Sequence, residues 1–182
     1  IGYSTFALSR LFWKLLRTSY KAGIYFPDDT AMKDFAQERV NPFIFNSPII
    51  KDELKQNLDN TRVKQFGNAF LELRGTWKKG NVKSIDLDIV MLDEVDEHNK
   101  DNIEFVGDRL LASKLNWMML GSQPSMHKTG IHAEFLNTDQ HFWLIKCPKC
   151  NHYNDLIEQI QAEHESIFGF HGETVFYKCH KC

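Results

Sequence analysis

One apolar run that ends in two acidic residues limits the fold more than any other feature of the sequence. Ile89 to Leu92 are all apolar, and Asp93 and Glu94 follow directly. A continuous apolar run of this length suits a parallel strand that is covered on both faces. Parallel α/β sheets place their ligands outside the carboxyl ends of the strands, so both carboxylates are expected at a binding site. We expect this strand to be central in its sheet.

The rest of the chain alternates helical and strand patterns. Apolar residues at helical spacing predict an amphipathic helix from Ser4 to Tyr20, which Gly23 ends before a short strand. This order predicts an α/β fold. Other expected elements are a helix capped by Asp28 to Thr30 and reaching Phe45, a helix from Pro48 to Leu58, a hairpin turn at Gly67-Asn68, a helix from Asp101 to Lys114, a buried strand from Trp117 to Leu120, a helix from Ile131 to Leu136 and a strand from His141 to Ile145.

Length and composition favour one main domain with a small appendage. The chain has 182 residues, of which 42% are hydrophobic, enough for one sizeable core. Its net charge of -2 excludes a globally basic nucleic-acid binder, although a local basic groove stays open. No run approaches the roughly 18 apolar residues that span a bilayer. We therefore expect no membrane contact.

The two acids after the central strand are expected to have different roles. Neighbouring side chains on an extended backbone point to opposite sides. We assign Asp93 to Mg²⁺ and Glu94 to the attacking water of a nucleotide hydrolase. The alternative is a strand that ends in solvated acids, since Asp96 and Glu97 follow. Ser122 and Ser125, after the next strand, are candidates for sensing a γ-phosphate, although such a segment is also an ordinary turn.

The printed sequence contains no phosphate-binding loop of the form Gly-x-x-x-x-Gly-Lys-Ser/Thr. The first helix occupies the place of the helix that follows such a loop. We therefore expect the chain to be a fragment of a longer polypeptide, with the loop immediately upstream of Ile1. The fragment itself should not hydrolyse ATP efficiently.

All four cysteines occur in two Cys-x-x-Cys pairs, which predicts a structural Zn²⁺ site. The pairs are Cys147 with Cys150 and Cys179 with Cys182, each preceded by a strand-like segment as in a zinc ribbon. Free thiols and redox chemistry remain alternatives. The interval between the pairs is longer than the usual 15 to 20 or so residues, which an inserted helix from Leu156 to Glu165 would accommodate. Cysteines that bind a metal rather than form disulfides are typical of a reducing compartment, so we expect the protein in the cytoplasm.

Several segments together resemble the large terminase subunit of tailed phages, of the lambda-like (GpA) type. The segments that carry the resemblance are Tyr25-Phe26-Pro27-Asp28-Asp29-Thr30, Lys33-Asp34-Phe35, Glu38-Arg39-Val40-Asn41-Pro42, Ser47-Pro48, Val90-Met91-Leu92-Asp93-Glu94-Val95-Asp96 and Cys147-Pro148-Lys149-Cys150-Asn151-His152-Tyr153. The resemblance implies a RecA-like P-loop NTPase sheet, mostly parallel and flanked by helices, that lacks the strand of the phosphate loop. It also implies a partial ATPase domain over residues 1–145 and a zinc-ribbon-like element over 146–182.

The resemblance further implies an ATPase that drives viral DNA into a capsid in the host cytoplasm. Such an enzyme uses ATP and Mg²⁺ and works as a homo-oligomeric ring with double-stranded DNA, a small terminase subunit and a portal protein; a nuclease domain follows it. Asp93 and Glu94 would be the Walker B pair. The motif that couples hydrolysis to DNA movement would be Ser122, Gln123, Pro124 and Ser125, where Gln123 departs from the usual Ser or Thr.

A cation for the developing phosphate charge is the least defined part of this assignment. Arg74 or Lys83 could supply it, and arginine suits bidentate phosphate contact better.

Two other functions stay open: a helicase or repair ATPase with a zinc ribbon, and a nucleotide-independent, zinc-containing DNA-binding module.

Overall fold

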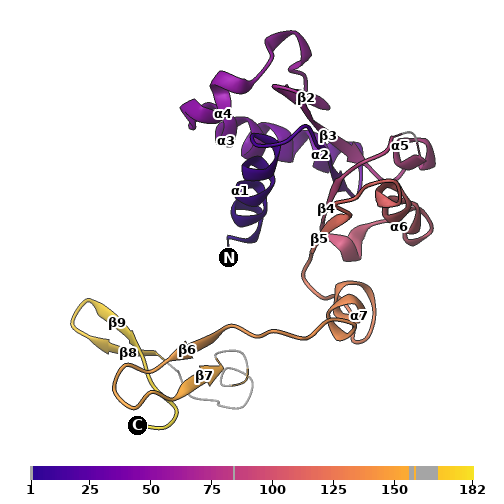
Figure 1. Ribbon diagram of the computed structural model, residues 1–182. Coiled ribbons are helices and arrows are strands. Elements are labelled where there is room, and N and C mark those ends of the chain that lie inside the picture. The colour runs from indigo at the N-terminus through magenta and orange to yellow at the C-terminus, as the bar shows by residue number, and fades with distance from the viewer. Residues whose placement is uncertain (1, 84, 156–157, 159–167) are drawn as a thin grey trace. The chain divides into compact units, whose positions relative to one another are not determined.

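The computed structural model describes residues 2–83, 85–155, 158 and 168–182 (Figure 1). The chain forms two compact units, Ile1–Leu136 and Asn137–Cys182, which we call the sheet unit and the cysteine unit. The domain boundary predicted at residues 145 and 146 falls inside the cysteine unit and stays a prediction.

The sheet unit is built on five strands in the order β2-β3-β1-β4-β5. The pairs β1–β3, β1–β4 and β4–β5 are parallel, and only the β2–β3 pair of this sheet is antiparallel. The expected mostly parallel α/β sheet is therefore confirmed, with β4 inside it. The strands are β1 (Lys21–Phe26), β2 (Val63–Phe66), β3 (Ala69–Gly75), β4 (Ile89–Asp93) and β5 (Trp117–Gly121).

Helices cover both faces of this sheet. The α-helices are α1 (Tyr3–Leu15), α2 (Asp29–Phe35), α3 (Asn41–Phe45), α4 (Pro48–Glu53), α5 (Lys79–Lys83), α6 (Lys100–Gly107) and α7 (Gly130–Leu136). Single turns are η1 (Ala36–Val40), η2 (Gln56–Leu58), η3 (Val95–Glu97) and η4 (Asp108–Leu110). Within the described residues no helix is both long and apolar enough to cross a membrane.

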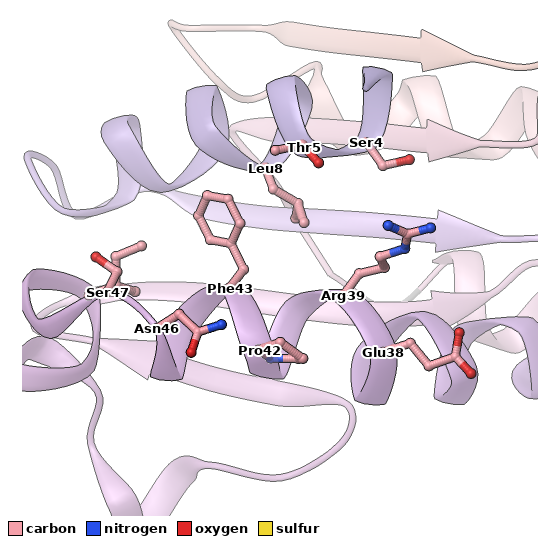
Figure 2. A pocket seen from close by; sticks show the side chains of 10 residues that line it. Ser4, Thr5, Leu8, Glu38, Arg39, Pro42, Phe43, Asn46 and Ser47 are labelled. Atoms are coloured by element: carbon pink, nitrogen blue, oxygen red, sulfur yellow. The ribbon is translucent and has the colours of Figure 1, made fainter. Parts of the chain in front are cut away.

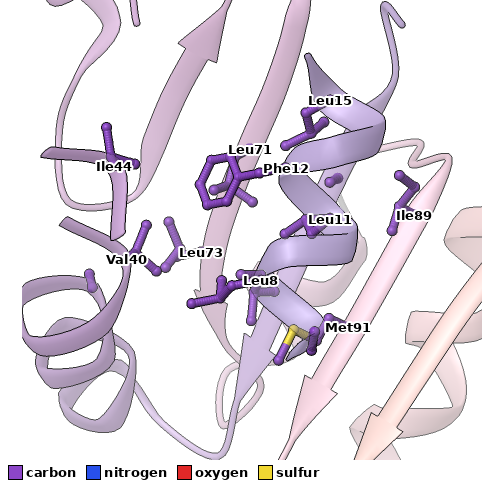
Figure 3. Packing of buried hydrophobic residues seen from close by; sticks show 14 of the residues in the cluster. Leu8, Leu11, Phe12, Leu15, Val40, Ile44, Leu71, Leu73, Ile89 and Met91 are labelled. Carbon is purple, nitrogen blue, oxygen red and sulfur yellow. The ribbon is translucent and has the colours of Figure 1, made fainter. Parts of the chain in front are cut away.

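Alternate residues of β4 enter two separate hydrophobic cores. Ile89 and Met91 pack with α1 and with the helices between α2 and α4 (Figure 3). Val90 and Leu92 pack on the other face with residues of α5 and α6. Because side chains of a strand point alternately to its two faces, the continuous apolar run reflects burial on both sides. This confirms the reading of the sequence from which the α/β fold was predicted.

The second helical segment begins as predicted, at an acidic cap. Asp28 Oδ1 accepts hydrogen bonds from the N–H groups of Thr30 (2.7 Å) and Ala31 (2.8 Å). The helix continues through α3, but η1 is a π turn, in which Asn41 N bonds to Ala36 O. Pro42 explains the widened turn, because its ring would clash with the carbonyl of the residue four positions earlier.

Gly23 does not end the first helix, which corrects the prediction. Helix α1 ends at Leu15, after which the Thr18 hydroxyl bonds to Lys14 O at 2.8 Å. Gly23 lies inside β1, where a Cβ would be 2.6 Å from Leu87 Cδ1. Glycine at this position lets Leu87 pack closely on the strand and does not form a turn, a distinction that depends on a residue 64 positions away.

The strand after α6 is less buried than predicted. In β5 only Gly121 is buried, and Met118 is 38% exposed. Within the described residues β5 is an edge strand, so one side of it has no paired strand. The preceding helix is also shorter than expected, because α6 passes into the turn η4 instead of continuing to Lys114.

The cysteine unit contains two antiparallel hairpins. One joins β6 (Leu144–Lys146) to β7 (Tyr153–Asp155), and the other joins β8 (Phe168–His171) to β9 (Thr174–Tyr177). Strands therefore precede both cysteine pairs, as predicted. Apart from residue 158, the predicted helix from 156 to 165 lies outside the described residues.

Candidate functional site

Asp93 and Glu94 lie at the carboxyl end of β4, in different environments. Asp93 is the last residue of the strand and pairs with Gly121 of β5. Glu94 has a left-handed backbone, with φ of 56° and ψ of 53°, and an exposed side chain. Burial, and then the charge of Glu94, raise the pKa of the half-buried Asp93 carboxyl. A bound cation would offset both effects, so the position suits a metal ligand.

The first turn of α1 lies beside Asp93. Tyr3 packs so closely on Gly121 that a Cβ there would overlap its ring. Burial, and then the negative charge of Asp93, raise the pKa of the Tyr3 phenol to about 12. The N-terminal end of α1 and the carboxyl ends of β4 and β5 therefore meet at one place.

His98 connects the end of β4 to Thr76, the residue that follows β3, a role that no pattern in the sequence indicated. It is 5% exposed; its Nε2 lies 2.7 Å from Asp93 O and its Nδ1 lies 2.8 Å from the Thr76 hydroxyl. Since a carbonyl only accepts, Nε2 carries the proton and Nδ1 accepts from Thr76. Burial lowers the pKa of His98, which favours this neutral form.

Asp96 is the residue that the predicted coupling motif contacts directly. Its Oδ2 accepts from the Ser125 N–H (2.8 Å) and the Ser125 hydroxyl (2.7 Å), and its Oδ1 accepts from Ile131 N (2.7 Å). The Asp96 N–H donates to the Ser122 hydroxyl at 3.2 Å. Hydrogen bonds from Ile131, and then from Ser125, lower the pKa of Asp96. The segment after β5 is thereby joined to the turn that follows Glu94.

The remaining coupling-motif residues, Gln123 and Pro124, are exposed. Asp96 was noted in the sequence only as one of several local acids. The role of Asp96 could not be predicted from its position two residues after Glu94, because its hydrogen-bond partners come from a segment about 30 residues further along the chain.

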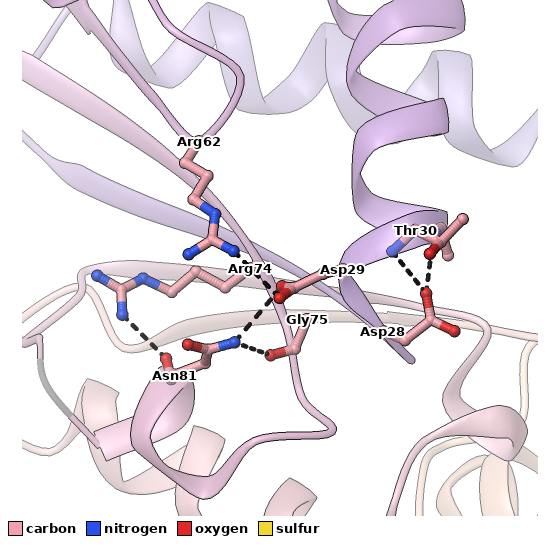
Figure 4. A network of polar contacts seen from close by, with 8 residues as sticks. Asp28, Asp29, Thr30, Arg62, Arg74, Gly75 and Asn81 are labelled. Carbon is pink, nitrogen blue, oxygen red and sulfur yellow. Dashed lines mark hydrogen bonds and ion pairs between the residues drawn. The ribbon is translucent and has the colours of Figure 1, made fainter.

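Arg74, the predicted phosphate-contacting cation, is held by its own neighbours. Its Nε donates to Glu72 Oε2 at 2.7 Å and its Nη1 donates to Asn81 O at 3.0 Å (Figure 4). A phosphate contact would require Arg74 to leave some of these bonds, and its assignment stays a prediction.

Arg39 is a second cation near the acids, and the sequence reading missed its role. Its positive charge is among the influences that lower the pKa of Asp93. The exposed Arg39 lines a pocket of about 460 Å³ together with Ser4 and Thr5 of the first turn of α1 (Figure 2). Figure 2 shows the guanidinium directed across the pocket towards Ser4.

The four cysteines gather at one point of the cysteine unit. Their sulfur atoms all lie within 4.8 Å of one another, with Cys147 and Cys182 at 3.9 Å and Cys150 and Cys179 at 3.6 Å. A tetrahedral site with Zn–S bonds of about 2.3 Å has sulfur–sulfur edges of about 3.8 Å. The donor set therefore fits Zn²⁺.

Local hydrogen bonds support this cluster. Backbone N–H groups of Cys150, and then of Lys149, lower the pKa of the Cys147 thiol, which favours the thiolate that binds metal. Asn154, 1% exposed, donates to Ile145 O (3.1 Å) and accepts from His180 N (3.0 Å). This amide ties the two Cys-x-x-Cys turns together.

These features define a class first: an α/β protein whose mostly parallel sheet carries paired acids at the carboxyl end of an inner strand. The whole chain, residues 1–182, matches the family described as phage terminase large subunit gpA, ATPase domain. The chain belongs to this family.

Solved phage terminases share the fold at low sequence identity. The HK97 bacteriophage large terminase matches with a TM-score of 0.62 and 10% identity, over 75% of this chain and 30% of that one. The large terminase of a thermophilic bacteriophage matches with a TM-score of 0.52 and 13% identity, over 72% of this chain and 33% of that one. The complex of that same terminase with ADP gives an equal TM-score at 11% identity, over 72% and 33% of the two chains.

The chain spans about a third of the length of these terminases. The comparison with curated proteins found no match.

Proposed function

We propose that the chain is the part of a DNA-packaging ATPase that binds Mg²⁺ and activates water. In this proposal Asp93 binds the Mg²⁺ that accompanies ATP, and Glu94 orients and deprotonates the attacking water. The observation that carries the proposal is the position of Asp93 at the carboxyl end of an inner parallel strand, beside Tyr3 in the first turn of α1, with Glu94 directly after it.

The surroundings of the acids support an anionic ligand. Helix N-termini attract anions through their unpaired N–H groups and their partial positive charge, and α1 begins beside Asp93. Arg39 adds positive charge near Asp93. The large terminase of the thermophilic bacteriophage, which has this fold, forms a complex with ADP. Arg74 is retained as a further phosphate contact, on condition that its present bonds rearrange.

Ser122, Gln123, Pro124 and Ser125 are proposed to couple hydrolysis to DNA movement. Ser122 and Ser125 contact Asp96, which follows Glu94 by two residues. A change in the Glu94 turn during hydrolysis would therefore be transmitted to the segment after β5.

In the complete large subunit, the proposed activity moves double-stranded DNA into a capsid. The proposed partners are a small terminase subunit and a portal protein, the assembly is a homo-oligomeric ring, and the location is the host cytoplasm. Membership of the terminase family supports these assignments.

The cysteine unit is proposed to be a structural zinc ribbon. Cys147, Cys150, Cys179 and Cys182 would fill all four positions of a tetrahedral Zn²⁺, leaving none for a substrate. Elemental analysis should find one zinc per chain; far less than one equivalent would contradict the assignment.

The catalytic proposal is tested in a large subunit that carries this chain. Glu94→Gln should bind ATP as the wild type does and slow its hydrolysis about 100-fold or more, because the general base is lost. Glu97→Gln, at an exposed acid three residues later, is the matched control and should hydrolyse ATP normally. A normal rate in Glu94→Gln would show that Glu94 is not the base.

A further inference from the structure

The segment that runs from the end of β3 through α5, residues 74–83, which we call the loop, carries a concentration of positive charge. Segment 74–83 contains four lysine or arginine residues and no acid, although the chain as a whole has a net charge of -2. Lys78 and Lys79 are exposed, and the Trp77 side chain between them and β3 is 69% exposed. A local cluster of this kind creates a positive surface potential that attracts polyanions even when the net charge of the protein is slightly negative.

The two ends of this loop are tied together. Asn81 Nδ2 donates to Gly75 O at 3.0 Å, and Arg74 Nη1 donates to Asn81 O at 3.0 Å (Figure 4). Gly75 packs against the turn before α2, where a Cβ would be 2.5 Å from the Asp28 carbonyl carbon. These contacts fix the positions of both ends of the loop.

Buried polar groups hold the first half of the loop from inside. The Thr76 hydroxyl lies 3.2 Å from Phe26 O and 2.8 Å from His98 Nδ1. Asn102 Nδ2 donates to Thr76 O at 2.8 Å and to Trp77 O at 3.1 Å. His98 also donates to Asp93 O, so the base of the loop and the catalytic strand belong to one hydrogen-bonded network. Such support is what a binding loop needs to present its side chains in one geometry.

The lysines of the loop are not neutralised by acids. Within the described part of the chain, no salt bridge involves Lys78, Lys79 or Lys83. Lys79 and Lys83 instead lie over the Phe105 ring, with Nζ at 4.7 Å and 4.2 Å from its centroid. Contact with a ring leaves an ammonium group its full charge.

We propose that this loop binds the sugar–phosphate backbone of duplex DNA; the choice of DNA as partner rests on the proposed function. Lys78 and Lys79 contact phosphate oxygens, and Trp77 packs on a deoxyribose while its indole N–H donates to a phosphate. These contacts carry no sequence information, which suits a protein that moves along DNA. The buried hydrogen bonds of Thr76 and His98 connect this DNA-binding loop to the end of β4.

The test measures binding of the purified protein to a random-sequence DNA duplex, without nucleotide, as a function of salt concentration. Each phosphate contact contributes about 0.9 to the slope of log K against log salt. Lys78→Ala/Lys79→Ala should therefore weaken binding and reduce that slope by about 1.8. The control Lys51→Ala/Lys55→Ala removes two exposed lysines from another part of the sheet unit and should leave the slope unchanged. Trp77→Ala should weaken binding more than Trp77→Phe.

An unchanged slope in Lys78→Ala/Lys79→Ala would overturn the proposal, and so would equal losses in the variant and the control. Loss of self-association with intact DNA binding, measured by sedimentation, would also overturn it, because the loop would then contact another copy of the chain. Since no nucleotide is present, failure of the ATPase proposal in Glu94→Gln leaves this result interpretable.

Discussion

The sheet unit and the cysteine unit are stabilised by different interactions. The sheet unit buries apolar side chains on both faces of its sheet. In the cysteine unit the buried residues, among those described, are Cys147, Asn154 and Gly169, while Trp143 and Phe170 are 88% and 72% exposed. The comparison teaches that the first unit carries its own hydrophobic core, whereas the second has little buried apolar surface around its cysteine cluster. Short segments with little buried apolar surface commonly need a metal or disulfides.

If the cysteine unit binds Zn²⁺ as proposed, removal of the metal should have the largest effect and should unfold one unit without the other. Binding of structural Zn²⁺ contributes about 10 to 16 kcal/mol in small zinc peptides, and this free energy is available only to the folded form. Cys150→Ser, or a strong chelator, should therefore unfold the cysteine unit while the sheet unit keeps its structure. Hydrogen exchange, followed by mass spectrometry over peptides from each unit, measures this difference.

The matched control for that experiment is His152→Ala, because in the described residues the metal-ligand cluster consists of cysteines alone. The control should keep its zinc and its hydrogen-exchange protection. Protection of the cysteine unit that persists in Cys150→Ser after chelation would contradict a metal-dependent fold.

A cavity in the core of the sheet unit should destabilise that unit and leave the cysteine unit unchanged. Leu71 of β3 is completely buried in the core beneath α1 (Figure 3). Leu71→Ala should lower the free energy of unfolding of the sheet unit by about 2 to 5 kcal/mol, through lost burial and the cavity left behind. Urea denaturation measures this change, and the zinc content should stay at the wild-type value. Ile49→Ala, at a side chain that is 74% exposed, is the control and should change little.

The same contrast explains how much of the fold could be predicted. The apolar run of β4 and the cap at Asp28 are local patterns, and both led to correct elements. The role of Gly23 could not be predicted, because it depends on Leu87, which packs on it from a distant segment. The exposure of β5 depends on which strands pair beside it, a property that its own apolar residues do not encode.

The residues of the candidate site also fall into those that local sequence indicates and those that depend on distant segments. Asp93, Glu94 and the four cysteines could be put forward from the sequence because their chemistry lies in short motifs, and their catalytic and zinc-binding roles stay predictions. His98, Arg39 and Asp96 were missed because each acts through partners that only the folded chain brings close. Their roles, unlike those of the predicted residues, follow from position rather than from residue type.

Thr76→Val tests whether polar groups matter within the apolar sheet unit. The Thr76 side chain is completely buried, and its hydroxyl is the partner of His98 Nδ1. Valine has nearly the same shape but leaves the ring nitrogen without its donor, which should cost about 1 to 3 kcal/mol of unfolding free energy. Thr76→Ser, which keeps the hydroxyl, should recover the larger part of that loss. Because Thr76→Val keeps a methyl group and Thr76→Ser keeps the hydroxyl, a Thr76→Ser loss as large as that of Thr76→Val would show that packing of the methyl group matters as much as the hydrogen bond. No loss in Thr76→Val would contradict a role for the hydrogen bond.

Asp96→Asn should have the smallest effect on stability, and its pH dependence identifies the cause. Asp96 accepts hydrogen bonds that lower its pKa in the folded state below the unfolded value of about 3.9. Its contribution is therefore fully present above that value and is lost as the pH falls through the folded pKa. Solvent screening limits the effect to about 1 kcal/mol. The difference in unfolding free energy between wild type and Asp96→Asn should thus shrink below about pH 4, whereas a difference independent of pH would mean that the carboxylate charge is not what holds Ser125 and Ile131.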